Sequence, residues 1–490
     1  MNKEEHLIKK ENEISIPDTQ EDSEIIDEEE ENRKFERNRR LYSNSNPNPD
    51  QLARLSLIRK LPLIHRLFRG FAKGSMRAVV MLWIRMTMGI GIMTTPFFIS
   101  GFGLLGGFIA LALGATLCFL SFGFIYETAI KTNKKDIAEL VNYALPGFLY
   151  NTFRFTVFCD YMVVILAYSI VSYNMFEYIL YFMGLFKEEW VKDKNKMIID
   201  EYNPSVILIR IAYFGSLFMI QMPLFLKKDL SSLRNISLMY LGVMVAFLIY
   251  ISIEAPFFKS HYANAGEWKV DMGVKPVTLN FIPNFFSLLL AFYNQPFCLS
   301  LRKELLNPTV NRLKKTTGLA VGWELLIYAF FGGLCYYSFG DYFTPQLIIL
   351  RTPFDGKNIV SEVVFKAGIV IFFFLNVLGL AVFNPTIRNY LLQYIEIKNK
   401  ALEYKLVSLG PFLLGCIIAI LTPNIITVFW FFGLVFCNFN GFIIPTLMKI
   451  RIIKSEKQGL FKLVLCYILV GLYVSLGVIG VCVKIRSIFA

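Results

Sequence analysis

Long apolar runs recur along this 490-residue chain, and their length constrains its fold more than any other feature. From residue 76 onward, eleven runs are apolar over about the 20 residues that a helix needs to cross a bilayer. Only 18% of the residues are charged and 55% are hydrophobic, which is unusual for a soluble protein of this length. The sequence therefore predicts an all-α polytopic membrane protein with eleven transmembrane helices. The predicted spans are residues 76–99, 102–126, 151–183, 205–226, 235–254, 278–300, 317–339, 361–393, 404–422, 425–448 and 460–483.

The first run contains residues that a continuous membrane helix avoids. Residues 85–96 place two glycines, three threonines, an arginine and a proline at mid-membrane depth. Glycine and proline weaken a helix, and lipid offers no partner to the backbone groups that they free. A break is therefore tolerated only where it faces protein or a watery cavity. We interpret residues 89–94 as the unwound centre of a substrate site.

The sixth run is interrupted near its middle by Tyr293, Asn294, Gln295 and Pro296. Two breaks five spans apart are what a five-plus-five inverted repeat predicts, with broken helices 1 and 6 meeting at the bilayer midplane. Half-helix N-termini then present free amides to a carboxylate, while freed carbonyls accept hydrogen bonds from an ammonium group. A zwitterionic amino acid suits such a site. The predicted substrate-binding residues are Gly89, Ile90, Gly91, Ile92, Met93, Thr94, Tyr168, Tyr293, Asn294 and Gln295.

Charged residues and amides inside the predicted spans are the candidates for ion coupling, because they are expensive there and usually find partners. Arg85 and Asp160 lie at similar depth in spans one and three, so they either form an ion pair or snorkel separately to the inner interface. Glu324 in span seven is an alternative proton carrier, unless it reaches water at the inner edge. Asn376 and Asn384 in span eight, and Asn438 and Asn440 in span ten, either line the pocket or fasten helices together.

The distribution of cations predicts the orientation of the chain. With a cytosolic N-terminus, the inner loops carry twenty Lys and Arg residues and the outer side carries eleven. Inner loops of membrane proteins are the more basic ones, so we expect the N-terminus in the cytosol and the C-terminus on the extracytosolic side. The membrane is expected to be a plasma membrane or one of the vacuole or lysosome type.

The segment before the first span divides into two parts. Residues 1–50 are polar and rich in acids, and they cannot bury enough apolar surface to offset the entropy of ordering, so we expect a disordered cytosolic tail. This tail is either a solvated segment or the docking site of a cytosolic partner. Residues 51–75 interleave cations with apolar residues, which favours an amphipathic juxtamembrane segment on the anionic leaflet or a simple topology signal. Residues 76–490 form the expected eleven-helix domain.

Cysteines and histidines give no indication of a cofactor or of enzyme chemistry. The eight cysteines lie in or beside apolar runs without a metal-binding spacing, and His6, His65 and His261 lie outside the spans. We therefore expect no disulfide framework, no metal site, no cofactor and no enzymatic activity. The net charge of +13 indicates basic inner loops rather than a surface for nucleic acid.

Several motifs together resemble those of one family, the amino acid/auxin permeases of the amino acid–polyamine–organocation group. In chain order they are Gly89-Ile-Gly-Ile-Met-Thr-Thr-Pro96, Phe292-Tyr-Asn-Gln-Pro296 with Glu304, Leu305 and Pro308, Asn384-Pro-Thr-Ile-Arg388, Phe432-Gly-Leu434 and Gly441-Phe-Ile-Ile-Pro445. The resemblance covers nearly everything after residue 75. It implies eleven helices, a pocket between spans 1, 3, 6, 8 and 10, and amino acid transport coupled to H⁺ or Na⁺.

Two departures from that family's pattern bear on the coupling ion. Sodium-coupled members typically carry Asn where this chain has Arg85, and some members carry His where this chain has Gln295. A guanidinium beside the break repels Na⁺, which favours H⁺. The expected function is secondary active transport of small neutral amino acids, H⁺-coupled, by alternating access. The alternatives are an amino acid sensor or scaffold and a transporter-derived structural subunit of a larger membrane assembly.

Deletion of residues 1–50 separates the first two functions. A transporter is expected to retain its amino acid flux, measured as uptake into cells or vesicles, because the tail contributes nothing to the membrane domain. A sensor is expected to lose a cytosolic partner, measured by co-purification. Loss of flux at unchanged membrane abundance would contradict the transporter prediction.

Overall fold

The computed structural model describes residues 75–87, 91–134, 136–186, 190–193, 198–200, 203–226, 233–264, 268–305, 308–343, 359–392, 399–422, 424–457 and 459–489. The chain divides into two compact units, Met1–Gly70 and Phe71–Ala490, and every described residue belongs to the second. The predicted acidic tail and nearly all of the predicted basic segment therefore lie outside the described residues.

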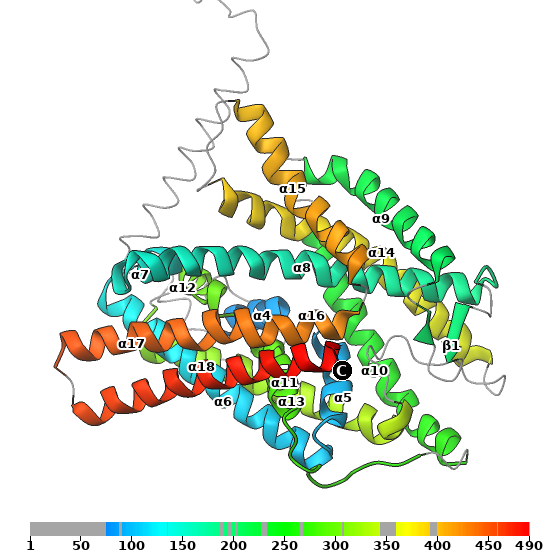
Figure 1. Cartoon of the computed structure of the whole chain (residues 1–490), viewed down its shortest axis with the longest axis horizontal. Coiled ribbons are helices and arrows are strands. Elements are labelled where there is room, and N and C mark those ends of the chain that lie inside the picture. Colours follow the sequence, from blue (N-terminus) through cyan, green and yellow to red (C-terminus); the bar gives the residue numbers. More distant parts are fainter. Residues whose placement is uncertain are drawn as a thin grey trace, which may run out of the picture. The chain divides into compact units, whose positions relative to one another are not determined.

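The described residues are almost entirely helical (Figure 1). The α-helices are α4 (Met76–Thr87), α5 (Gly91–Ser100), α6 (Leu104–Lys131), α7 (Ile137–Ala144), α8 (Gly147–Phe182), α9 (Pro204–Phe225), α10 (Leu233–Asn264), α11 (Phe281–Leu289), α12 (Cys298–Glu304), α13 (Val310–Phe343), α14 (Ile359–Leu391), α15 (Lys400–Leu421), α16 (Ile425–Phe432), α17 (Ile444–Ser455) and α18 (Leu460–Phe489). Two strands, β1 (Val191–Asp193) and β2 (Ile198–Ile199), pair antiparallel in the α8–α9 connection.

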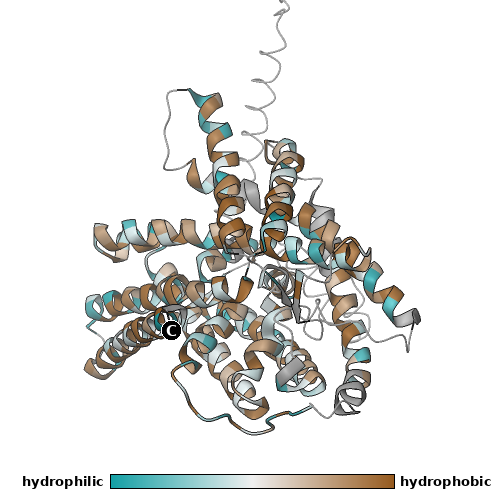
Figure 2. Cartoon of the chain, turned by 45° about the vertical axis from the view of Figure 1, so that its right-hand side comes forward, coloured by the Kyte–Doolittle hydropathy of each residue, from teal (hydrophilic) through white to brown (hydrophobic). Residues whose placement is uncertain are grey.

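Eight helical stretches in the described part of the chain are long and apolar enough to cross a membrane. They correspond to α6, α8, α9, α13, α14, α15, the continuous stretch from α16 to α17, and α18. The other three predicted spans are not among these eight. In the described residues, spans one and six are made of shorter helices. Span five corresponds to α10, whose apolar stretch, Gly242–Phe257, is shorter than the other eight. Figure 2 shows the hydrophobic residues distributed along these helices.

The unwound segment predicted for span one, residues 89–94, is longer than the structure allows. Helix α4 ends at Thr87 and α5 already begins at Gly91, so residues 91–94, predicted as unwound, are helical. A helix can begin here because its first four amides need no acceptor within the helix. The hydroxyls of Thr94 and Thr95 each donate to the Gly91 carbonyl at 2.9 Å, which stabilises this first turn. Residues 88–90 lie outside the described residues.

Span six is divided where the sequence predicts it. After α11, the 3-10 turn η3 (Leu290–Phe292) leads to Tyr293, whose backbone is extended at φ −75° and ψ 115°. A second 3-10 turn, η4 (Gln295–Phe297), with Pro296 in its first turn, then leads into α12. The chain therefore leaves the α-helical conformation for about two turns, from Leu290 to Phe297.

Helices that are five spans apart in the sequence pack against each other. The contacting pairs are α5 with α11, α6 with α13, α8 with α14, and α9 with α15. Helix α10 contacts both α13 and α14, and α17 packs along α6 and α18. In Figure 1, α17 and α18 run side by side. One continuous cluster of buried aliphatic and aromatic side chains joins most of these helices.

One end of this packing is held by ion pairs among residues that the sequence assigns to the cytosolic side. Glu127, near the C-terminus of α6, pairs with Lys314 of α13 and with Lys449 of α17. Lys131 pairs with Glu456 at 2.5 Å. A single carboxylate thus fastens three helices together at this end.

The opposite end of α6 is covered by the loop that follows α10. The amide of Leu104 donates to the Asp271 carbonyl at 2.8 Å, which satisfies one of the free amides at the start of the helix. Gly103 (φ +79°) and Gly340 of α13 (φ +74°) both approach this loop closely. A Cβ on them would lie 2.6 Å from the Gly273 carbonyl oxygen and 2.8 Å from the Lys269 carbonyl oxygen, respectively.

Substitution of Gly433 tests the close approach between α11 and η6 (Gly433–Cys437). A Cβ there would lie 2.5 Å from the Phe286 carbonyl oxygen, so Gly433→Ala is expected to lower the free energy of unfolding by about 1–3 kcal/mol. The matched control is Gly410→Ala in α15, where a Cβ meets nothing within 4 Å. Melting temperatures of both variants in detergent provide the measurement, and equal values would contradict the expected clash.

Candidate substrate site at the two helix breaks

The described start of α5 lies against the break in span six. A Cβ on Gly91, the first residue of α5, would lie 3.7 Å from the Cα of Ala291 in η3. The Ala291 carbonyl accepts a hydrogen bond from the Tyr328 hydroxyl of α13 at 3.0 Å. The ring of Tyr328 also contacts that of Phe292, with the centroids 5.3 Å apart. Helix α13 therefore supports the irregular backbone of span six and satisfies one of the carbonyls there.

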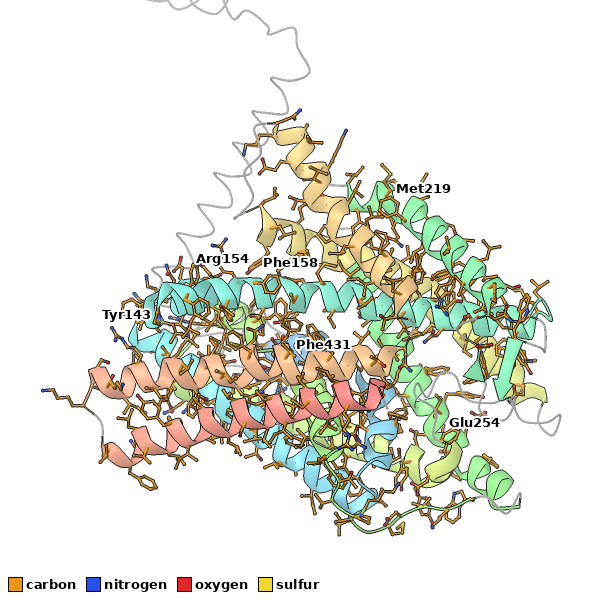
Figure 3. All side chains as sticks on the ribbon, viewed as in Figure 1. Tyr143, Arg154, Phe158, Met219, Glu254 and Phe431 are labelled. Carbon is orange, nitrogen blue, oxygen red and sulfur yellow. The ribbon has the colours of Figure 1, made fainter. Side chains whose placement is uncertain are left out.

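Asp160 of α8 is the centre of a buried hydrogen-bond network. One of its oxygens, Oδ2, accepts from the Tyr293 hydroxyl at 2.5 Å and from Asn440 Nδ2 at 2.7 Å. Thr156, one turn earlier on α8, donates to Asn440 Oδ1 at 2.6 Å. Figure 3 labels Arg154 and Phe158, which lie just before Asp160 on this helix. The network joins span three to the break in span six and to span ten.

The π-helical part of span ten fits closely against this break. A Cβ on Gly441, in η7 (Phe439–Ile443), would lie 3.2 Å from the Tyr293 ring and 3.6 Å from Gln295 Cδ. The Gly441 carbonyl accepts from the Ser121 hydroxyl of α6. π-Helical turns widen the helix locally and are frequent at functional sites. Glycine at this position lets the two irregular segments approach, and Ser121 holds the backbone in place.

Three polar atoms around the span-six break are buried without a hydrogen-bond partner among the described residues. They are Asp160 Oδ1, Asn294 Nδ2 and Gln295 Nε2. Leaving such a group unsatisfied costs about 1–3 kcal/mol, so each one calls for an explanation. The carboxylate oxygen can only accept hydrogen bonds when it is ionised, whereas the two amide nitrogens donate. One acceptor and two donors are complementary to a ligand that carries both an ammonium and a carboxylate group.

Glu324 of α13 is fully buried, at 0% exposure, and so does not reach water at the inner edge. The described donor to its Oε1 is the Thr87 hydroxyl, at the last residue of α4. The other oxygen, Oε2, has no partner among the described residues. A second buried carboxylate therefore lies beside the span-one break.

The other predicted site residues have different surroundings. Ile92, Met93 and Thr94 are buried in the first turn of α5. Asn376 Nδ2 donates to the Tyr168 carbonyl at 2.8 Å, so this amide fastens α14 to α8. Gly89, Ile90 and the side chain of Arg85 lie outside the described residues. The Arg85–Asp160 ion pair therefore stays a prediction.

The sequence did not single out the hydrogen-bonding roles of Thr156, Tyr328 and Thr87. Thr156 lies four residues before Asp160 and so shares its helix face, which is a signal that sequence reasoning can use. Tyr328 likewise lies four residues after Glu324. Thr87 gives no such signal, because its partner lies 237 residues away in the chain.

Apolar helices of membrane-spanning length, packed around the break in span six with its buried polar groups, define an integral membrane protein with an internal polar site. A family model described as "Transmembrane amino acid transporter protein" matches residues 72–487. The chain belongs to this family of transmembrane amino acid transporter proteins.

Two further similarities are more distant. The chain is 21% identical over 279 residues to the "Putative amino acid transporter AAT1" of Plasmodium falciparum (isolate 3D7), a match that covers 56% of this chain and 41% of that protein. Among solved structures it is similar to the Eremococcus coleocola manganese transporter, crystallised with an aromatic bis-isothiourea substituted compound. That similarity has a TM-score of 0.49 and 12% identity, and it covers 85% of this chain and 87% of the other.

Substitution of Tyr293 tests the network around Asp160. Tyr293→Phe removes the hydroxyl that donates to Oδ2, so the free energy of unfolding is expected to fall by about 1–3 kcal/mol. Tyr467→Phe, an exposed tyrosine of α18, is the matched control. In an Asp160→Asn background the effect of Tyr293→Phe is expected to shrink, because the charged acceptor is gone. An undiminished effect in that background would disprove the interaction.

Proposed function

We propose that this protein is a secondary active transporter of small neutral amino acids that works by alternating access and is coupled to H⁺. The observation that carries the proposal is the set of buried, unpartnered polar atoms at Asp160, Asn294 and Gln295, beside the meeting point of the two breaks. A zwitterion supplies the hydrogen-bond partners that these atoms lack. Membership in the amino acid transporter family supports the substrate class.

The proposed substrate contacts follow from the donors and acceptors available. The N-terminus of α5, from Gly91 to Thr94, offers free amides and the positive end of the helix dipole to the substrate carboxylate. Asn294 and Gln295 provide further donors from the other break. Residues Gly89 and Ile90 complete the proposed backbone cradle. Met93, Tyr168 and Tyr293 are the side chains proposed to set selectivity.

The proposed coupling ion is a proton, with Asp160 and Glu324 as its candidate carriers. Both are carboxylates buried inside the protein, and each has one oxygen without a described partner. A carboxylate can take up and release a proton, which is what a proton carrier requires. Arg85 and Asn376 complete the proposed set of coupling residues. Arg85 is proposed to act through its charge beside the predicted break in span one.

An inverted repeat and a rocking motion complete the proposal. The pairing of α5 with α11, α6 with α13, α8 with α14 and α9 with α15 supports two halves related by a five-span shift. In such folds one bundle rocks around a fixed central site. We further propose that the N-terminus faces the cytosol and the C-terminus the opposite side, since the predicted inner cations Lys131, Lys314 and Lys449 share one end of α6.

Uptake of a panel of labelled amino acids into proteoliposomes, with and without a pH gradient, tests the proposal. Small neutral amino acids are expected to enter faster down an inward proton gradient, and Na⁺ is expected to have no effect. Asp160→Asn is expected to reduce uptake by about tenfold or more and to flatten its pH dependence, because it removes a charged hydrogen-bond partner.

The control is Glu139→Gln, an exposed carboxylate of α7, which is expected to behave like the wild type. If Asp160→Asn left both uptake and its pH dependence intact, the coupling role of Asp160 would be abandoned. Absence of uptake by the wild type for every amino acid would favour a sensor or a structural subunit.

A further inference from the structure

Thr87 lies beside the buried carboxylate of Glu324 and is the last described residue before the break that the sequence predicts in span one. It is the last residue of α4, and its side-chain oxygen lies within hydrogen-bonding distance of three acceptors. Two of them are carbonyls of its own helix, Trp83 at 3.1 Å and Ile84 at 3.3 Å. The third is Oε1 of Glu324 on α13. The hydroxyl therefore has both an intrahelical and an interhelical partner available.

A threonine hydroxyl carries one hydrogen, so it cannot donate to both kinds of partner at once. An ionised Glu324 only accepts hydrogen bonds, and Thr87 must then donate across to α13. When Glu324 gains a proton, its own O–H donates to a lone pair of Thr87, and the threonine hydrogen returns to the Trp83 or Ile84 carbonyl. One proton is added to the carboxylate, and the direction of the interhelical bond reverses.

The other described groups around Glu324 do not replace this donor. Tyr328, one turn after Glu324 on α13, donates its hydroxyl to the Ala291 carbonyl. Helix α5 has no titratable side chain, and the carboxylate of α10, Glu254, accepts from Tyr250 of the same helix at 2.8 Å. The Arg85 side chain, two residues before Thr87, lies outside the described residues.

We propose that Thr87 is a positioning residue that transmits the protonation state of Glu324 to the end of α4. This inference rests on the proposed proton-coupled transport. When Glu324 is ionised, the hydroxyl ties α4 to α13. When it is protonated, the hydroxyl bonds back to its own helix, and such back-bonding tends to bend a helix. The sequence predicts a break in residues 88–90, which follow Thr87 and lie outside the described residues, so the exchange is proposed to act on the backbone that would hold the substrate.

The test is the pH profile of uptake by full-length protein in proteoliposomes, for wild type, Thr87→Val, Thr87→Ser and Glu324→Gln. Thr87→Val keeps the shape of the side chain but removes the hydroxyl that donates to the ionised carboxylate. The pH at which its uptake is half-maximal is therefore expected to rise by about one pH unit. Thr87→Ser retains a hydroxyl and is expected to keep the wild-type midpoint. In a Glu324→Gln background, Thr87→Val is expected to cause no shift.

An unchanged midpoint for Thr87→Val, or the same shift in the Glu324→Gln background, would overturn the role of Thr87 while leaving the transport proposal intact. Wild-type uptake that is absent or independent of pH would overturn both. Melting temperatures verify that each variant is folded. Should Thr87→Val fail to fold, Thr87→Ala takes its place under the same two criteria, since it also lacks the hydroxyl.

Discussion

The constraint on which this structure depends is that lipid offers no hydrogen bonds to a broken helix. Each irregular segment near the centre of the fold is accordingly supported by a side chain from another helix. Tyr328 of α13 donates to the Ala291 carbonyl, and Ser121 of α6 donates to the Gly441 carbonyl. The packing of α6 and α13 around the breaks therefore serves to satisfy backbone groups as well as to exclude lipid.

The same packing leaves a small number of polar atoms unpaired, and their location is informative. Four of the residues concerned, Asp160, Asn294, Gln295 and Glu324, lie in spans three, six and seven near the centre of the fold, while others, such as Gln221 and Ser408, lie elsewhere among the described residues. Other buried amides, such as Asn376, have a partner for at least one of their groups in a neighbouring helix. Asp160, Gln295 and Glu324 combine two roles, because in each of them one oxygen has a described partner and a second polar atom has none.

Much of the fold could be predicted from apolar length, because the hydrophobic thickness of a membrane fixes the length of a span. The break at Tyr293 could be predicted because polar residues and a proline interrupt an apolar run there. The restart of α5 at Gly91 could not, since it depends on local hydroxyl-to-carbonyl bonds. Helix α7 was missed because it is short. In the site, Asp160 was foreseeable as a charge in a span, whereas its partners Tyr293 and Asn440 come from distant parts of the sequence.

Gly103 precedes α6 and Gly340 lies in α13, yet both have a left-handed backbone and both adjoin a carbonyl of the same loop. A side chain at either position would collide with main chain, which cannot rotate aside as a side chain can. Replacement of one glycine is thus acceptable only if the loop is rebuilt as well. During evolution, Gly103, Gly340 and the loop after α10 should therefore change together. Insertions in this loop should accompany substitutions at both glycines.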